Sequence, residues 1–268
     1  MGGKEMSSLE ITTPSRYALD GVGGNFVMLT STGHQPCAFP SLALPSSLTV
    51  MDTETHTYEG DDVTVTWDRE RCIHAQACVE GLPDVFDPER QPWIEPNQAD
   101  ADAVEAVVPR CPTGALHLTR NGEDPEPTPE ANRISLFPNG PLLVHADAEL
   151  IGADGRTLLT DTRMALCRCG RSGNKPLCDG SHDGEFEDGG HIAVDQLTVS
   201  DEGGEEGPLR IRATEDGPFV VEGPVTIEGA DGEEIEGHRG ALCRCGASSS
   251  KPFCDGSHAH LAFEAPAE

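Results

Sequence analysis

Short alternating apolar segments, rather than long amphipathic ones, carry most of the hydrophobic pattern in this chain of 268 residues. Residues 63–67 (VTVTW) alternate between apolar and polar side chains and predict a strand, and residues 115–118 (ALHL) predict a second one. Residues 97–108 (NQADADAVEAVV) place three valines on one helical face, with Asn97 as the candidate N-cap. This pattern predicts a small α+β domain over residues 58–120.

A second pattern occurs twice in the rest of the chain. The segment GPLLV that starts at Gly140 recurs as GPFVV at Gly217, 77 residues later. Each unit carries alternating strands around an Asp-Gly turn and then ends in a cysteine-rich loop, which is typical of a repeated β-rich module. Polar, proline-rich residues precede the first unit and indicate a linker. The predicted order is an extension at 1–57, the α+β domain at 58–120, a linker at 121–131, a module at 132–187, a linker at 188–207 and a module at 208–268.

Charge is distributed unevenly along the chain. The net charge is −29, whereas residues 1–50 hold three acidic and two basic side chains and show no apolar periodicity. That segment is expected to be a disordered extension, or to precede a true start at Met51. Because a strongly negative field repels phosphates, nucleic acid and anionic membranes are excluded as partners. No stretch approaches the ~20 apolar residues of a membrane span.

The ten cysteines favour metal binding over disulfides. Nine of them fall into three groups with metal-ligand spacing, and Cys37 stands alone. Such spacing indicates a reducing compartment, so we expect a cytoplasmic protein. The two repeated loops both read C-x-C-x8-C-x3-H, and C-x3-H spans one helical turn, so its two side chains can share a face. The candidate ligands are Cys167, Cys169, Cys178 and His182 in the first loop and Cys243, Cys245, Cys254 and His258 in the second.

These loops resemble the CDGSH iron–sulfur family, which includes mitoNEET, over about residues 130–187 and 208–264. The resemblance implies that each loop holds one [2Fe-2S] cluster through three cysteines and one histidine. Family members with a single motif pair as homodimers, so the tandem copies are expected to form a pseudo-dimer within one monomeric chain. Spacing alone also permits a structural zinc site of the Cys3His type.

Basic residues are concentrated beside the two loops. Residues 162–178 and 238–254 contain arginines and lysines but no acid, in a chain that is otherwise acidic. A cluster bound by three thiolates is negatively charged and becomes more so on reduction, so nearby cations would stabilise it. The candidate cofactor-binding residues are Arg168, Lys175, Arg244 and Lys251.

A third group of cysteines lies in the α+β domain. Cys72 and Cys78 keep the first and third positions of the C-x2-C-x2-C run of bacterial ferredoxins, Ala75 replaces the middle one, and Cys111 precedes a proline. Residues 60–120 therefore resemble the divergent single-cluster ferredoxins. Three thiolates suit a [3Fe-4S] cluster, whereas a fourth ligand, for which His74 is the nearest candidate, would allow [4Fe-4S].

The sequence lacks a nucleophile–base arrangement, a phosphate loop and a nucleotide-binding fingerprint, so we do not expect an enzyme. The main hypothesis is a one-electron carrier with three clusters that serves a redox partner, either a reductase or a ferredoxin-dependent enzyme. A second hypothesis is a cluster store or donor to an apo iron–sulfur acceptor, or a redox sensor. A zinc-stabilised interaction module is the third.

Overall fold

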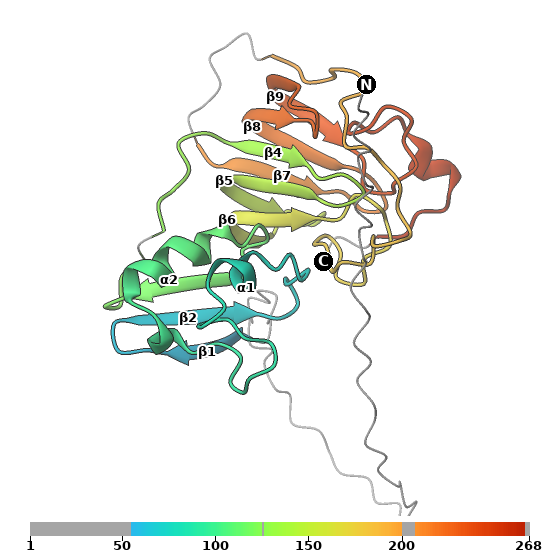
Figure 1. Ribbon diagram of the computed structural model, residues 1–268. Helices are drawn as coiled ribbons and strands as arrows, with labels where there is room; N and C mark the ends of the chain where they lie inside the picture. Colours follow the sequence, from blue (N-terminus) through green and yellow to red (C-terminus); the bar gives the residue numbers. More distant parts are fainter. Residues whose placement is uncertain (1–54, 125, 200–206, 266–268) are drawn as a thin grey trace, which may run out of the picture. The chain divides into compact units, whose positions relative to one another are not determined.

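The computed structural model describes residues 55–124, 126–199 and 207–265 (Figure 1). Most of the predicted extension, Cys37 and the candidate start at Met51 lie outside these residues. The first strand begins at Thr55 and therefore includes the last three residues of the segment predicted as an extension. Alternating threonine and aromatic residues at this point allow the chain to extend one sheet by an edge strand.

The first domain contains a three-stranded antiparallel sheet in the order β1-β2-β3. Its core consists of alternate strand residues, including Val65 and Leu118, packed against valines of the helical segment. The helices lie on one side of this sheet (Figure 1). Its elements are β1 (Thr55–Glu59), β2 (Val63–Asp68), α1 (Ala77–Gly81), the 3-10 turn η1 (Pro96–Gln98), α2 (Ala101–Val107), the 3-10 turn η2 (Val108–Arg110) and β3 (Leu116–Arg120).

The helix starts later than the sequence predicts. Asp100 is its N-cap, because the Asp100 carboxylate accepts a hydrogen bond from the Ala103 N–H at 2.9 Å. Asn97 instead lies in η1, and its side-chain oxygen accepts a hydrogen bond from the Asp61 N–H. Both residues can cap a helix, and Ala99 is extended between them, which interrupts the helical turn that would have begun at Asn97. The prediction of Asn97 as the cap was therefore wrong.

The two β-rich modules share one six-stranded sheet and one hydrophobic core. The first module supplies a short strand and two long ones, and the second supplies the same set, so the fold is mostly β with few helices. The strands are β4 (Arg133–Leu136), β5 (Leu142–Ile151), β6 (Thr157–Leu166), β7 (Leu209–Ala213), β8 (Phe219–Glu228) and β9 (Glu234–Leu242), and the 3-10 turn η3 (Ser257–His260) follows.

Each short strand of this sheet pairs with one long strand from each module. β4 is antiparallel to the first half of β5 in its own module and parallel to the second half of β8. β7 is likewise antiparallel to the first half of β8 and parallel to the second half of β5. A register shift between His145 and Ala148 in β5 has its counterpart between Glu222 and Val225 in β8, where each long strand changes partner. The two repeats are therefore held together by backbone hydrogen bonds.

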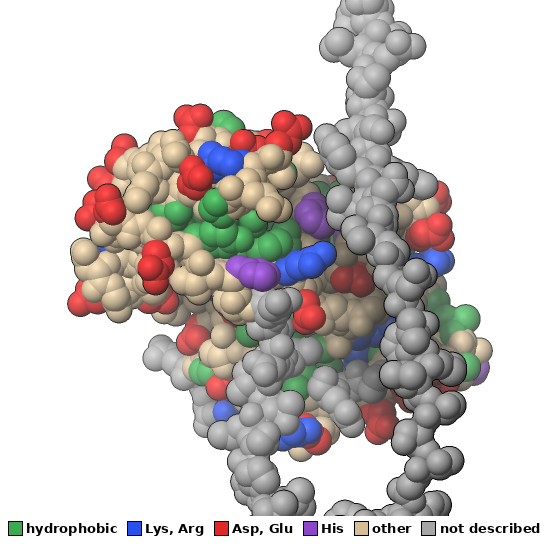
Figure 2. Space-filling view, turned by 90° about the horizontal axis from the view of Figure 1, so that it is seen from below, with side chains coloured by type: hydrophobic (Ala, Val, Ile, Leu, Met, Phe, Trp, Pro, Cys, Tyr) green, Lys and Arg blue, Asp and Glu red, His purple; other side chains and the backbone are tan. Residues whose placement is uncertain are grey.

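Acidic side chains are spread over the surface, whereas basic ones are few on the face seen in Figure 2. This distribution agrees with the net charge of −29. No helix within the described residues is both long and apolar enough to cross a membrane.

Candidate metal centres

The first cysteine-rich loop follows directly from the end of β6. The Cys167 N–H donates to the Pro176 carbonyl at 3.0 Å, and the Cys178 N–H donates to the Ala165 carbonyl at 2.9 Å, which closes the loop against the strand. The four candidate ligands form two close pairs. The Sγ atoms of Cys167 and Cys169 are 3.7 Å apart, and the Cys178 Sγ lies 3.2 Å from the Nδ1 of His182.

The second loop follows β9 and repeats this geometry. The N–H groups of Cys243 and Cys254 donate to the carbonyls of Pro252 and Ala241, each at 2.8 Å. The Sγ atoms of Cys243 and Cys245 are 3.7 Å apart, and the Cys254 Sγ lies 3.3 Å from the Nδ1 of His258. Two loops that differ in several residues therefore present the same two ligand pairs.

An aspartate after the third cysteine braces each loop. Asp179 accepts hydrogen bonds from the N–H groups of Gly173 and Ser181, at 2.7 and 2.9 Å. Asp255 accepts from Ser249 and Ser257 at 2.8 and 3.0 Å. These contacts orient the turn that carries the histidine, as expected for a short side chain that caps a turn.

The ligand pairs suit tetrahedral metal ions. Two thiolates bound at ~2.3 Å to one tetrahedral ion lie ~3.8 Å apart, close to the observed 3.7 Å in both loops. The Sγ–Nδ1 distances of the cysteine–histidine pairs are slightly shorter, and in both loops it is the Nδ1 atom of the histidine that faces the thiol. Each loop can therefore hold one metal ion by its Cys-x-Cys pair and a second by its Cys–His pair.

The thiols of the first loop have unequal pKa values. The thiol–thiol hydrogen bond from Cys169 lowers the pKa of Cys167 to about 6, while the same contact raises the pKa of Cys169. Burial raises the pKa of Cys178 to about 11. Burial also lowers the pKa of His182, which favours the neutral imidazole that a metal ion needs. A cation would then draw the remaining protons from the thiols.

The two cysteine-rich loops lie against each other. A Cβ added to Gly170 would come within 2.9 Å of the Cys245 carbonyl oxygen, and one added to Gly246 within 2.8 Å of the Cys169 carbonyl oxygen. Both glycines have positive φ, at 78° and 81°. The backbone of one ligand cysteine in each loop thus lies against a glycine of the other loop.

The four candidate cations bind protein groups. Arg168 is buried, donates to the carbonyls of Phe137 and Gly140, and forms an ion pair with Asp188. Lys175 and Lys251 each donate from Nζ to a serine carbonyl of their own loop at 2.6 Å. These side chains brace the loops while their charges remain beside the cysteines.

Arg244 differs from its counterpart Arg168. In module 1 the Asp188 N–H donates to the Asn139 side chain, and in module 2 the Ala265 N–H donates in the same way to the Asp216 side chain. Ala265 therefore occupies the position of Asp188. Arg244 consequently has no carboxylate partner within 4 Å among the described residues. Its buried Nη2 makes no hydrogen bond in the described structure. Burial lowers the pKa of Arg244, which the nearby Cys167 and Asp216 partly offset. This buried N–H group lacks an acceptor and lies near the Cys167 thiol, so the site suits an anionic group.

The N-terminal thiols form a third site. Cys72 follows β2, Cys78 lies in α1, and Cys111 follows η2. Burial, with a smaller contribution from the neighbouring Cys111 and Cys72 thiols, raises the pKa of Cys78 to about 11. The His74 side chain is exposed, and its backbone N–H faces the Cys72 thiol. The three thiols lie close enough to influence one another's charge, and the His74 backbone, not its ring, faces Cys72.

Near this site lies a group of charged residues, most of them buried, that no sequence motif indicates. Glu126, in the segment predicted as a polar linker, is buried and forms an ion pair with Arg163 of β6. His117 of β3 lies 3.1 Å from Glu126 and 3.0 Å from Asp161. Arg71, next to Cys72, binds the same Asp161 at 2.6 Å. We call these five residues the junction cluster. No local spacing could have revealed it, because its members lie up to 92 positions apart.

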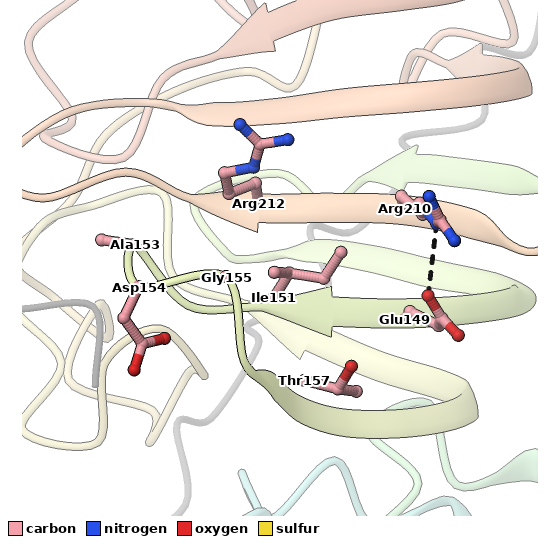
Figure 3. Close-up of a pocket in the computed structure, with 8 residues that line it drawn as sticks. All are labelled: Glu149, Ile151, Ala153, Asp154, Gly155, Thr157, Arg210 and Arg212. Atoms are coloured by element: carbon pink, nitrogen blue, oxygen red, sulfur yellow. Dashed lines mark ion pairs between the residues drawn. The ribbon is translucent and has the colours of Figure 1, made fainter.

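The clearest surface pocket lies elsewhere. It is formed by β5, β7 and the Asp-Gly turn, and Arg210 pairs there with Glu149 at 3.3 Å (Figure 3). Its lining residues include neither cysteine nor histidine. It is therefore separate from the three thiol sites.

Comparison with known proteins identifies related domains. A family described as "Divergent 4Fe-4S mono-cluster" matches residues 58–121. A family described as "Iron-binding zinc finger CDGSH type" matches residues 139–183 and 216–259. Uncharacterized protein YjdI of Escherichia coli strain K12 is 34% identical over 67 residues, which are 25% of this chain and 88% of that protein. YjdI of Escherichia coli O157:H7 gives the same values.

Proposed function

Because the chain belongs to the divergent 4Fe-4S mono-cluster and CDGSH iron-binding families, with one copy of the first and two of the second, we propose that it is a one-electron carrier. Iron–sulfur clusters supply centres that accept and release single electrons. The protein's part is to hold the ligands, exclude bulk water and bring the sites together. The close approach of the two ligand loops, with Gly170 against the Cys245 carbonyl and Gly246 against the Cys169 carbonyl, carries this proposal.

The ligand pairs support [2Fe-2S] clusters in the two CDGSH loops. A dinuclear cluster needs two ligands on each iron, which is the division into a Cys-x-Cys pair and a Cys–His pair. A mononuclear zinc site would need all four ligands at one ion. The exchange of strands between the modules supports a pseudo-two-fold pair within a single monomer.

For the N-terminal, ferredoxin-like domain we propose one [4Fe-4S] cluster held by Cys72, Cys78 and Cys111. The family match supports this nuclearity over [3Fe-4S]. Because the His74 ring is exposed, the fourth ligand would be His74 after a local rearrangement or a group from solution. Electron paramagnetic resonance distinguishes the two forms, since [3Fe-4S] gives its signal in the oxidised protein.

The proposed partner is a cytoplasmic redox protein, either a reductase or a ferredoxin-dependent enzyme, with no role for nucleic acid or membranes. Iron and zinc analysis of anaerobically purified protein, with a visible spectrum, tests the assignment. We expect about seven to eight irons per chain and reduction by a ferredoxin or flavoprotein reductase. Stoichiometric zinc in a colourless protein would refute it and favour the interaction module.

Cluster donation is the second candidate, supported by the partial exposure of His182 and His258. Neutral imidazole competes with protons for iron, whereas thiolate hardly does, so the histidine side of each site is the labile one. Replacing both histidines by cysteine should retain the clusters, make them harder to reduce and less acid-labile. Rapid transfer to an apo-ferredoxin by the native protein, together with slow reduction, would favour the donor over the carrier.

A further inference from the structure

The ferredoxin-like domain contacts the first CDGSH module through its own ligand loops. Arg163 of β6 donates from Nη1 to the Cys111 carbonyl at 3.0 Å and to the Val108 carbonyl at 2.9 Å. Asn174, between Cys169 and Cys178, donates from Nδ2 to the Glu70 carbonyl at 2.8 Å, two residues before Cys72. The contacts thus join segments that carry thiol ligands on both sides.

Buried charges complete this contact. Arg71 binds Asp161 and also donates to the Arg163 carbonyl at 2.8 Å, and both side chains are nearly inaccessible to solvent. Arg163 is also buried and pairs with Glu126. Because a buried charge is tolerated only when it is paired, the two surfaces need each other to remain satisfied.

The second module presents a different surface at the matching positions. Arg239 corresponds to Arg163, but Gly237 stands in place of Asp161 and Ser250 in place of Asn174. Module 2 therefore keeps one arginine of this surface and lacks both the carboxylate and the amide that bind the ferredoxin-like domain.

The linker covers this surface of module 2. The Thr198 N–H donates to the Arg239 carbonyl, the His238 N–H donates to the Thr198 carbonyl, and the Ala193 N–H donates to the Lys251 carbonyl, each at 2.9 Å. The Leu197 side chain packs so closely on Gly237 that a Cβ added there would lie 2.5 Å from it. Residues 192–198 thus occupy the place that the ferredoxin-like domain takes on module 1.

We infer that module 1 alone carries a docking face for the ferredoxin-like domain, with Arg163 and Asn174 as positioning residues, and that residues 192–198 close the matching face of module 2. This rests on the proposed function, which it deepens by making module 1 the neighbour of the N-terminal site. An external ferredoxin or flavoprotein would supply electrons one at a time to this assembly.

The test compares equivalent substitutions in the two modules of the full, cluster-loaded chain. Asn174→Ser gives module 1 the residue of module 2, and Arg163→Lys removes the fork of donors while keeping the charge. Their matched controls are Ser250→Ala and Arg239→Lys. Amide hydrogen exchange of residues 69–72 and 108–116 reports docking, and the spin–spin splitting of the reduced N-terminal signal reports the distance between sites.

We expect Arg163→Lys to speed hydrogen exchange in both segments by about tenfold and to weaken the spin–spin splitting. Asn174→Ser should speed exchange in residues 69–72 only. The two control variants should change neither exchange nor splitting. Unchanged exchange and splitting in both module 1 variants, or equal changes in the controls, would overturn the inference. Failure of the proposed function would appear differently, as missing iron or clusters that cannot be reduced, while hydrogen exchange would still report docking.

Discussion

The two CDGSH modules have the same ligand geometry but different surroundings. Their Sγ–Sγ distances are identical, whereas Arg168 is paired with Asp188 and Arg244 has no carboxylate partner among the described residues. Module 1 contacts the N-terminal domain, and module 2 contacts its own linker. Ligand spacing can therefore be retained in a repeat while the residues that set charge and neighbours diverge. The following predictions test this difference.

The largest effect is expected from removing the carboxylate of the junction cluster. Asp161→Asn leaves the buried Arg71 and the half-buried His117 with a neutral partner, which should lower the free energy of unfolding by about 3–5 kcal/mol. Urea unfolding measures this. Asp231→Asn removes an exposed histidine–aspartate pair and should change the free energy of unfolding far less. Equal losses in the two variants would contradict the role of the junction.

The paired arginines should respond unequally to the same substitution. Arg168→Met removes the buried partner of Asp188, which then keeps only Lys251 at 3.7 Å, and should cost about 3–5 kcal/mol, as judged by urea unfolding. Arg244→Met removes an arginine with no carboxylate partner and should stay within about 1 kcal/mol. In the loaded protein, however, Arg244→Met should lower a cluster reduction potential, because a nearby positive charge is lost. A loss of stability as large as that of Arg168→Met would show that the hydrogen bond from Arg244 to the Thr214 carbonyl matters as much as a buried ion pair.

The contact between the loops predicts a smaller effect. Gly170→Ala places a Cβ against the Cys245 carbonyl and adds the cost of a positive φ, so we expect a loss of about 2–3 kcal/mol and a change in the second cluster's spectrum. Gly180→Ala has a similar φ but open space around the added Cβ, and should cost about 1–2 kcal/mol. Thermal unfolding and visible circular dichroism distinguish the two variants. Equal effects would mean that the loops do not touch.

The smallest effect concerns pH. Burial alone would lower the pKa of His117, but hydrogen bonds and charges from Asp161 and Glu126 outweigh it and raise the pKa to about 9. This pair of contacts should therefore stabilise the fold fully below pH 6.5 and lose its effect as pH rises through 9. Allowing for partial exposure, the contribution is about 1–2 kcal/mol. Unfolding at pH 7 and 10 measures it.

His117→Gln should reduce the loss of stability between pH 7 and 10. The control His191→Gln, at an exposed pair on module 2, should keep the native pH dependence. If His117→Gln also retains that dependence, another group is responsible for it.

The sequence by itself determined the parts of this protein that depend on local spacing. The C-x-C-x8-C-x3-H spacing predicted the ligand pairs, the repeat predicted two similar β-rich modules, and valine periodicity predicted a helix that packs on a sheet. The predicted helix start was wrong because Asn97 and Asp100 are both good N-cap residues. The backbone conformation between them decides which one caps the helix. The assigned cluster types and the role in electron transfer remain predictions.

Only the tertiary structure decided which distant residues meet. Glu126 appears in the sequence as one acid in a polar linker, yet it is buried against Arg163. Only their equivalent hydrogen bonds in the structure show that Asp188 and Ala265 occupy matching positions in the two modules. The contact between the ligand loops depends on the exchange of strands between modules. Spacing restricts residues that share a turn or a loop, whereas pairing between separate segments depends on how the whole chain buries its apolar surface and satisfies its charges.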